Sequence, residues 1–315
     1  MAVARKQVII DTDPGIDDAI AIFLALADAG VEVLGLTPVA GNSPLENTTL
    51  NALRILDLAD RPDIPVCPGA ARPLVHLAPR YAADTHGELG LGEAELIAPS
   101  RSASSEHAVD FIVRTVRSAG APVTIVAIGP LTNIALLVAT HPEVIPSIEE
   151  VVVMGGGSEG NATPAAEYNI WFDPEGAQRV LQSGLNLTFV GLDVTHQANL
   201  TPDDLPRIAA MGKVGSALGR MLETYDAAHQ QFYGSRLLPM HDALAIAHVI
   251  DPSLMRFEHL RVDVDCGFSI GRGATVLDRW GITGAPKNVR YARTVDSERF
   301  HLLLMDRLDR FSGVD

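Results

Sequence analysis

The stretch VIIDTDPGIDDA at residues 8–19 joins a short apolar run to four aspartates that lie within eight residues. The apolar run is typical of a strand buried on both faces, and the Pro-Gly pair marks a turn before a helical pattern. Carboxylates at this density repel one another, so they need either solvent or a positive charge among them. The stretch therefore predicts a strand, a turn and a helix, with a charged site where the strand ends.

The same alternation of apolar runs and helical patterns continues along the chain. Runs rich in Val and Ile lie at 31–42, 123–133, 151–157 and 187–195, and helical patterns follow most of them. This order predicts an α/β fold, in which a mostly parallel twisted sheet is flanked by helices on both faces around a Rossmann-like core. Ligands of such sheets bind outside the carboxyl ends of the strands, so the polar residues that end these runs should converge there.

The 315 residues are expected to form one domain. The segment of about 196–240 is helical but less regular, and we expect it to cover part of the crevice as a lid. Within it Tyr225 and His229 are four residues apart and share a helix face, whereas the sequence does not place Tyr233.

Composition limits the partners and the compartment. The formal net charge of −15 disfavours nucleic acid and anionic membranes as partners, but it leaves a small neutral ligand open. Cys67 and Cys266 are too few for a disulfide framework and are interpreted as free thiols in a reducing compartment. No long apolar segment precedes the acidic cluster, and the longest apolar run is too short to span a bilayer. A cytoplasmic protein is the expectation.

The acidic cluster has a structural explanation and a functional one. Asp13 follows the strand, and Asp17 and Asp18 begin the helix, where acids complement the helix dipole. Capping accounts for one or two acids but not for four beside a turn, which favours a hard divalent cation bound through oxygen. Asp11 lies two residues before Asp13 on the same side of the strand, and we expect it to support the site from behind.

Two further stretches carry candidate residues. Asp242, directly after His241, precedes an apolar helical pattern and could equally be an ordinary acid at a helix start. The loop GNATPAAEYN (160–169) offers two amides and a carboxylate without Lys or Arg, which suits neutral hydroxyls better than phosphate, although it could also be a polar surface loop. No His/Cys cluster has the spacing of a transition-metal site, so zinc is not expected.

Together these motifs resemble one family. DTDPGIDDA, AGN (40–42), GPLTN (129–133), VVMGG (152–156), the GN…TPAAEYNIWFDPEGA block and HDALA are similar, in this order, to motifs of the nucleoside hydrolases, the inosine–uridine-preferring N-ribohydrolases. The tail, from TVLDRWGITG onward, is also similar, so the resemblance covers nearly the whole chain. It implies the nucleoside hydrolase fold.

The resemblance also implies a calcium site. By it, Asp13 ligates Ca²⁺ and acts as the general base, and Asp18 and Asp242 are further ligands. Ile128, where many relatives carry Thr, offers its backbone carbonyl to the ion, and a carbonyl ligand does not depend on the side chain.

The remaining matched positions would bind the nucleoside. His241 is implied as a catalytic residue near the leaving base, where a histidine that titrates near neutral pH would be useful. His86 matches a second histidine near the base. The implied substrate-binding residues are Asp17, Asn42, His86, Met154, Asn161, Glu167 and Asn169.

The expected function is therefore calcium-dependent hydrolysis of ribonucleosides to free base and ribose, in nucleoside salvage. The histidine before Asp242 favours a pyrimidine or broad base preference, and the resemblance implies a homodimer or homotetramer. Two alternatives stay open at this point. A magnesium phosphohydrolase can also begin from a DxD at a strand end, and a non-catalytic relative could bind nucleosides or sugars without turnover.

Overall fold

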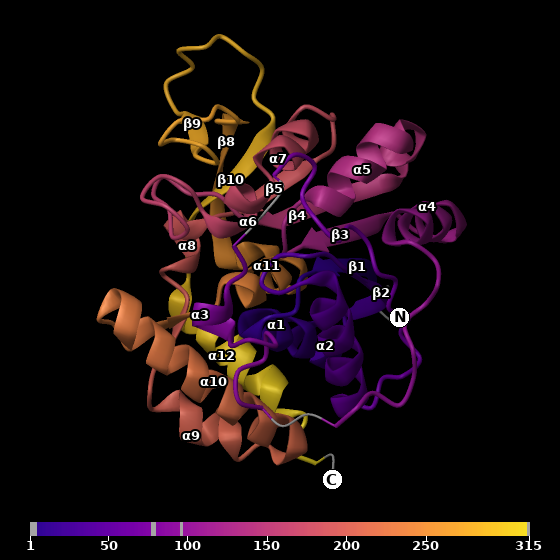
Figure 1. Cartoon of the computed structure of the whole chain (residues 1–315), viewed down its shortest axis with the longest axis vertical. Helices are drawn as coiled ribbons and strands as arrows, with labels where there is room; N and C mark the ends of the chain where they lie inside the picture. Colours follow the sequence, from indigo (N-terminus) through magenta and orange to yellow (C-terminus); the bar gives the residue numbers. More distant parts are fainter. Residues whose placement is uncertain (1–4, 77–79, 95–96, 314–315) are drawn as a thin grey trace.

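The computed structural model describes residues 5–76, 80–94 and 97–313 (Figure 1). Residues 1–4, which begin the N-terminal stretch considered above, lie outside this range. The strands of the main sheet are β1 (Lys6–Thr12), β2 (Val31–Pro38), β3 (Val123–Ala127), β4 (Ile148–Met154), β5 (Leu187–Val190), β8 (Met255–Val264), β9 (Thr275–Asp278) and β10 (Val289–Val295). A small second sheet contains β6 (Asn199–Leu200) and β7 (Leu238–Pro239).

The helices alternate with the strands along most of the chain. They are α1 (Ile16–Ala27), α2 (Leu45–Leu58), α3 (Ala83–His86), α4 (Ala108–Ser118), α5 (Thr132–Thr140), α6 (Tyr168–Phe172), α7 (Pro174–Leu181), α8 (Leu192–Thr195), α9 (Asp204–Ala209), α10 (Gly212–Tyr233), α11 (His241–Ile250) and α12 (Ser297–Asp309). Two 3₁₀ helices, η1 (Pro142–Ser147) and η2 (Pro252–Leu254), complete the described elements. None of these helices has both the length and the apolarity that crossing a membrane requires.

The main sheet has the predicted parallel character. Its strand order in the described residues is β2-β1-β3-β4-β5-β10-β8-β9, and every neighbouring pair from β2 to β10 is parallel. The last two strands, β8 and β9, are antiparallel to their neighbours. The mostly parallel α/β fold is thus confirmed, and the tail adds an antiparallel edge that the sequence patterns did not predict.

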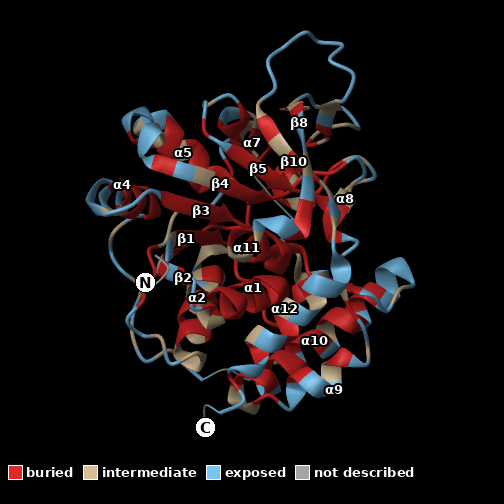
Figure 2. Cartoon of the chain, turned by 180° about the vertical axis from the view of Figure 1, so that it is seen from behind, coloured by how far each residue is buried: buried red, intermediate tan, exposed pale blue. Residues whose placement is uncertain are grey.

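Alternate residues of the strands face two separate cores. Val8 and Ile10 of β1 pack in one apolar cluster with α1, α2, α10, α11 and α12, whereas Ile9 packs in the other with α4, α5 and α7. Successive side chains of a strand point to opposite faces, so a strand covered on both sides must be apolar throughout. Figure 2 shows the resulting buried sheet between two layers of helices.

Helix α1 lies unusually deep. Every residue from Ile16 to Ala25 is buried, and the helix packs against α11, α10, α12 and α2. Because β1 leads directly into it through Pro14 and Gly15, the aspartates at this junction are held by the interior of the protein.

The segment of 196–240 is largely helical. Strands β6 and β7 pair with each other near its two ends, and α9 and α10 lie between them. Tyr225 and His229 are buried on α10, whereas Tyr233 at its end is exposed.

The contact between β2 and α4 gives a test of the packing. A Cβ on Gly35 of β2 would lie 2.7 Å from Cε1 of the buried Phe111 and closer still to its Cζ. We expect Gly35→Ala to lower the free energy of unfolding by about 1–3 kcal/mol, the usual cost of overpacking. Urea denaturation measures it. Gly120→Ala, where a Cβ would meet no atom within 4 Å, is the control, and equal stability of both variants would contradict the packing.

Candidate active site

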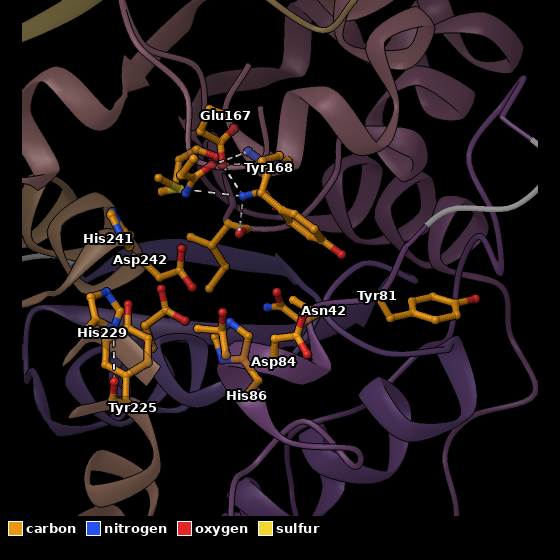
Figure 3. A pocket seen from close by; sticks show the side chains of 18 of the residues that line it. Asn42, Tyr81, Asp84, His86, Glu167, Tyr168, Tyr225, His229, His241 and Asp242 are labelled. Carbon is orange, nitrogen blue, oxygen red and sulfur yellow. Dashed lines mark hydrogen bonds between the residues drawn. The ribbon is translucent and has the colours of Figure 1, made fainter. Parts of the chain in front are cut away.

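The predicted site residues converge at the carboxyl ends of the parallel strands. Ten of the twelve line one pocket, and the other two, Asp13 and Asp18, are fully buried beside it (Figure 3). In Figure 3 the loop that carries Glu167 and Tyr168 faces His86 and Tyr225 across the pocket. The ten are Asp17, Asn42, His86, Ile128, Met154, Asn161, Glu167, Asn169, His241 and Asp242.

Asp13 occupies a tightly fitted position at the end of β1. The backbone N–H of Asn42 donates to its Oδ2 at 2.6 Å, while its buried Oδ1 has no hydrogen-bond partner among the described residues. A Cβ on Gly129 would lie 2.5 Å from Oδ1, and one on Gly41 would be closer still to Oδ2. The two glycines therefore make room for the carboxylate, the Asn42 N–H holds its Oδ2, and Oδ1 stays available to a ligand.

Asp18 is held by donors from the turn that precedes α1. Its Oδ1 accepts from the Thr12 hydroxyl at 2.5 Å, and its Oδ2 accepts from the Gly15 N–H at 2.9 Å and from Asn42 Nδ2 at 3.1 Å. Asp18 therefore caps the start of α1, as the structural explanation of the acidic cluster predicted. Capping does not explain Asp13 and Asp17, because neither of them makes such a contact.

Asp11 supports the site from behind, outside the pocket lining. Its Oδ2 accepts from the Thr37 hydroxyl at 2.6 Å and from Asn133 Nδ2 at 2.8 Å. Burial raises the pKa of Asp11 to about 7 despite these two hydrogen bonds. Asn133, the last residue of GPLTN, lies in α5 and also accepts from the Ala70 N–H, so it links α5 both to β1 and to the segment that follows β2.

Three buried carboxylates come close enough to share a cation. Asp17, Asp18 and Asp242 each offer an oxygen that lies within 4.8 Å of the others. Burial, and then the charge of Asp18, raise the pKa of Asp17 to about 8; burial and the charge of Asp17 raise that of Asp242 well above its usual value. Burial and mutual repulsion destabilise the ionised form of these carboxylates. A hard divalent cation bound among their oxygens would stabilise it.

This cluster differs from the predicted ligand set in one member. The geometric group contains Asp17, whereas the resemblance implies Asp13. Asp13 lies close to the same group, because its charge also raises the pKa of Asp242, and its unpaired Oδ1 is available. The Ile128 carbonyl lines the pocket and accepts from Asn169 Nδ2 at 2.9 Å.

The 160–169 loop forms one wall of the pocket and is not an ordinary surface loop, and its buried residues are Ala166, Glu167 and Asn169. Glu167 caps α6: its Oε1 accepts from the Asn169 N–H, and its Oε2 accepts from the N–H groups of Ile170 and Gly156. Burial nevertheless raises the pKa of Glu167. Asn161 Oδ1 accepts from the Tyr168 N–H, and its amide nitrogen has no acceptor among the described residues, so it can donate to a ligand. The loop thus presents polar atoms whose positions are fixed by backbone amides.

The opposite wall contains histidines that are neutral. The Ile16 N–H donates to His86 Nδ1 at 3.1 Å, so the ring proton of His86 is on Nε2. Burial lowers the pKa of His86 to about 3. Nδ1 of His229 donates to the Tyr225 carbonyl at 3.0 Å, and its ring packs on that of Tyr225.

His241 does not titrate in the range that the sequence suggested. Its Nδ1 lies 2.7 Å from Thr195 Oγ1, and burial, followed by the neighbouring His196, lowers its pKa well below the usual value. The imidazole of His241 is therefore neutral near pH 7. It can donate a hydrogen bond through its N–H group, but it is not an imidazolium that could transfer a proton to the leaving base.

Several lining residues were not assigned from the sequence. Tyr168 lies inside a quoted motif, and its hydroxyl is 2.7 Å from the Gly41 carbonyl, which links the loop to the glycine beside Asp13. Arg80, Tyr81, Asp84 and Thr85 line the pocket from the segment before His86, where no sequence signal marked them. Arg80 places a guanidinium group at the pocket, although the loop of 160–169 itself carries no Lys or Arg.

The family is shown by comparison. The pattern of a family described as "Inosine-uridine preferring nucleoside hydrolase" matches residues 8–302. The chain belongs to the nucleoside hydrolase family. The match leaves the magnesium phosphohydrolase alternative without support.

Relatives and solved structures agree with this assignment. This nucleoside hydrolase is 42% identical to an uncharacterised protein of Schizosaccharomyces pombe over 96% of its own chain and 99% of the relative. It is 41% identical to the pyrimidine-specific ribonucleoside hydrolase RihA of Salmonella gallinarum over 97% and 99% of the two chains. A plant nucleoside hydrolase, PpNRh1, has 36% identity and a TM-score of 0.91 over 96% and 99%. A purine-preferring ribonucleoside hydrolase from Gardnerella vaginalis has 32% identity and a TM-score of 0.93 over 98% and 100%.

The buried carboxylates predict how pH and a cation act on stability. Asp17 has a pKa near 8 when folded and its ordinary value of 3.8 when unfolded, so between these values the folded state binds more protons. Without a cation, stability should therefore fall as the pH rises through this window. Because Ca²⁺ competes with protons for the same oxygens, it should raise the melting temperature more at about pH 8 than at about pH 6.

Thermal unfolding with and without Ca²⁺ at the two pH values measures the effect. Asp242→Asn should reduce the stabilisation by Ca²⁺, whereas Asp204→Asn, a buried acid of α9 outside the pocket, should not. An equal or larger increase at the lower pH would contradict the competition.

Proposed function

We propose that this nucleoside hydrolase depends on bound Ca²⁺ when it cleaves the N-glycosidic bond of ribonucleosides, and that it prefers pyrimidine nucleosides or accepts both classes. As a member of its family it is an enzyme that acts on N-glycosyl compounds. The observation that carries the proposal is the buried Asp13 carboxylate, one oxygen of which has no partner in the part of the chain that the structure describes, beside three further buried acids at the pocket.

Asp13 is suited to act as the general base. Its Oδ1 can accept a proton from an attacking water while the Asn42 N–H holds its Oδ2 in place. Burial, and then the charge of Asp18, raise the pKa of Asp13 well above its usual value, so the unliganded carboxyl is protonated more readily than an exposed one. A cation nearby would lower this pKa again and keep the base ionised.

The donor set fits Ca²⁺. Carboxylates of Asp13, Asp18 and Asp242 with the Ile128 carbonyl would hold it, and it would orient ribose hydroxyls and acidify a bound water. Asp17 lies near enough to this set to accept from a ribose hydroxyl or to share the ion.

The sugar side of the pocket can stabilise the positive charge that develops on the ribose in the transition state. Breaking the bond builds positive charge at C1′ and the ring oxygen, which the surrounding carboxylates favour. The amide nitrogen of Asn161 makes no hydrogen bond within the described residues, and Oε1 of Glu167, which accepts one backbone amide, can accept one more donor, whereas Oε2 already accepts two. Hydroxyls paired with these fixed groups would select ribose, because without them buried polar atoms go unpaired.

The base side supplies neutral N–H donors. His86 presents Nε2–H because its Nδ1 is already an acceptor, and His241 lies beside Asp242 on the same wall. A donor to a carbonyl oxygen of the departing base lowers the cost of its negative charge. Uracil and cytosine both carry such an oxygen, which supports the pyrimidine or broad preference. A cytoplasmic location and assembly as a homodimer or homotetramer stay predictions.

The deciding assay is ribose release from uridine, cytidine and inosine before and after removal of divalent ions. Release that stops on chelation and returns with Ca²⁺, but not with Mg²⁺ alone, is expected. Asp13→Asn should lower kcat by at least about a hundredfold, because it removes the base, while the melting temperature changes little. Asp204→Asn is the matched control. Undiminished release after chelation, or near-normal turnover of Asp13→Asn, would refute the calcium site or the base.

A second prediction concerns the leaving base. His241→Ala should lower kcat for uridine by about a hundredfold, as loss of a donor to the leaving group does. The same variant should hydrolyse p-nitrophenyl riboside at nearly the normal rate, since nitrophenolate leaves without a proton. An equal loss on both substrates would show that His241 acts through the structure of the site and not through the base.

A further inference from the structure

The base of the helical segment of 196–240 brings Thr195 and His241 together. Thr195 is the last residue of α8, directly before this segment, and His241 is the first residue of α11, directly after it. Strands β6 and β7 pair at the two ends of the segment, and the Met240 N–H donates to the Ala198 carbonyl at 2.8 Å. Backbone hydrogen bonds therefore hold in contact two side chains that are 46 residues apart.

Helix α8 is also tied to the main sheet. Its first N–H group, that of Leu192, donates to the Gly156 carbonyl at 2.8 Å. Asp193 accepts from the Ser158 N–H at 2.9 Å and from the Tyr291 hydroxyl at 2.5 Å. These contacts join α8 to β10 and to the loop that follows β4, so the helix that carries Thr195 is fixed by the sheet as well as by the helical segment.

The direction of the hydrogen bond between Thr195 and His241 follows from the partners of the hydroxyl. Thr195 Oγ1 lies 2.7 Å from His241 Nδ1, and Thr195 is fully buried. The hydroxyl makes no other hydrogen bond in the part of the chain that the structure describes. If Nδ1 carried a proton, the hydroxyl hydrogen would be buried without an acceptor, which is unfavourable. The hydroxyl therefore donates, and Nδ1 accepts.

This direction sets the tautomer of the imidazole. A histidine ring whose Nδ1 accepts a hydrogen bond carries its proton on Nε2. Nε2 of His241 has no hydrogen-bond partner among the described residues, and His241 lines the pocket (Figure 3). Its Nε2–H group is therefore available to donate to a ligand there.

We propose that Thr195 is a positioning residue, which holds His241 in the Nε2–H tautomer and in the orientation that donates to the departing nucleobase. The inference rests on the proposed function and adds a residue to it. Thr195 does not itself belong to the described lining of the pocket, so it acts through the imidazole. Without its hydroxyl the ring could carry its proton on Nδ1, and Nε2 would then present a lone pair to a carbonyl oxygen of the base.

Thr195→Val removes the hydroxyl and nearly keeps the shape of the side chain. We expect kcat for uridine to fall about tenfold, the effect of losing one orienting hydrogen bond, while KM changes little. The rate on p-nitrophenyl riboside should stay nearly normal, since nitrophenolate leaves without a donor. Thr195→Ser, which keeps a hydroxyl, should restore most of the rate on uridine.

Thr188→Val is the matched control. Thr188 is an equally buried threonine of β5 outside the pocket, and its hydroxyl donates to Glu150. Its loss should leave the ratio of the two rates unchanged. An equal loss of both rates in Thr195→Val, or a Thr195→Ser variant as slow on uridine as Thr195→Val, would overturn the positioning role.

A double-variant cycle tests whether Thr195 acts through His241 alone. In a His241→Ala background, Thr195→Val should cause no further loss of kcat on uridine, because the ring that it positions is absent. A second loss of about tenfold there would show that Thr195 acts by another route and would overturn the proposal.

Nitrogen NMR of protein labelled at histidine shows the tautomer without any turnover. The His241 resonances, identified by their loss in His241→Ala, should show a protonated Nε2 and an unprotonated Nδ1 in the wild type. Thr195→Val should show a mixture of the two tautomers. A wild type that releases no ribose would refute the proposed function, whereas a proton on Nδ1 of the wild type would overturn this inference whatever the activity.

Discussion

The site depends on keeping several carboxylates apart from water and close to one another at the start of α1. Burial and like charges both raise the free energy of these anions, and the structure offsets this with short, directed donors from Asn42, Thr12 and Gly15. The donors come from the turns themselves, so the strand, the turn and the helix cannot be altered separately from the chemistry. What the donors leave unpaired, Oδ1 of Asp13 above all, is where an ion or a water fits.

The sequence predicted most of the sheet because its strands are apolar on both faces and its helices follow at regular intervals. It located the acids because they stand at a strand end, where topology brings polar residues together. It did not predict the antiparallel pairing of β8 and β9, since edge strands with mixed burial have no continuous apolar run. It also missed Arg80 and Tyr81, which reach the pocket from an irregular segment without periodicity.

The protonation of the histidines could not have been predicted from the sequence either. A histidine in a motif suggests titration near neutrality, but the pKa depends on burial and on neighbours far apart in the chain. The Ile16 N–H fixes the tautomer of His86 from seventy residues away, and besides burial the proximity of His196 and His229 disfavours a proton on His241 and so lowers its pKa. These are properties of the folded chain alone.

Because α1 is deeply buried, the two sides of the pocket differ in how well they tolerate amino-acid substitutions. Asp17 and Asp18, two of the acids proposed to meet the sugar or the ion, lie on α1, which four other helices enclose, so a change there disturbs the core. The residues proposed to meet the base stand on α10, on α11 and on the segment of 80–86, where buried side chains such as His86 and His229 lie beside exposed ones such as Tyr233. Substitutions at the exposed positions of that side, such as Tyr233, would disturb the core less than substitutions on α1. This fold can thus change its preference for a nucleobase through substitutions at exposed positions, while the acids at the start of α1 stay the same.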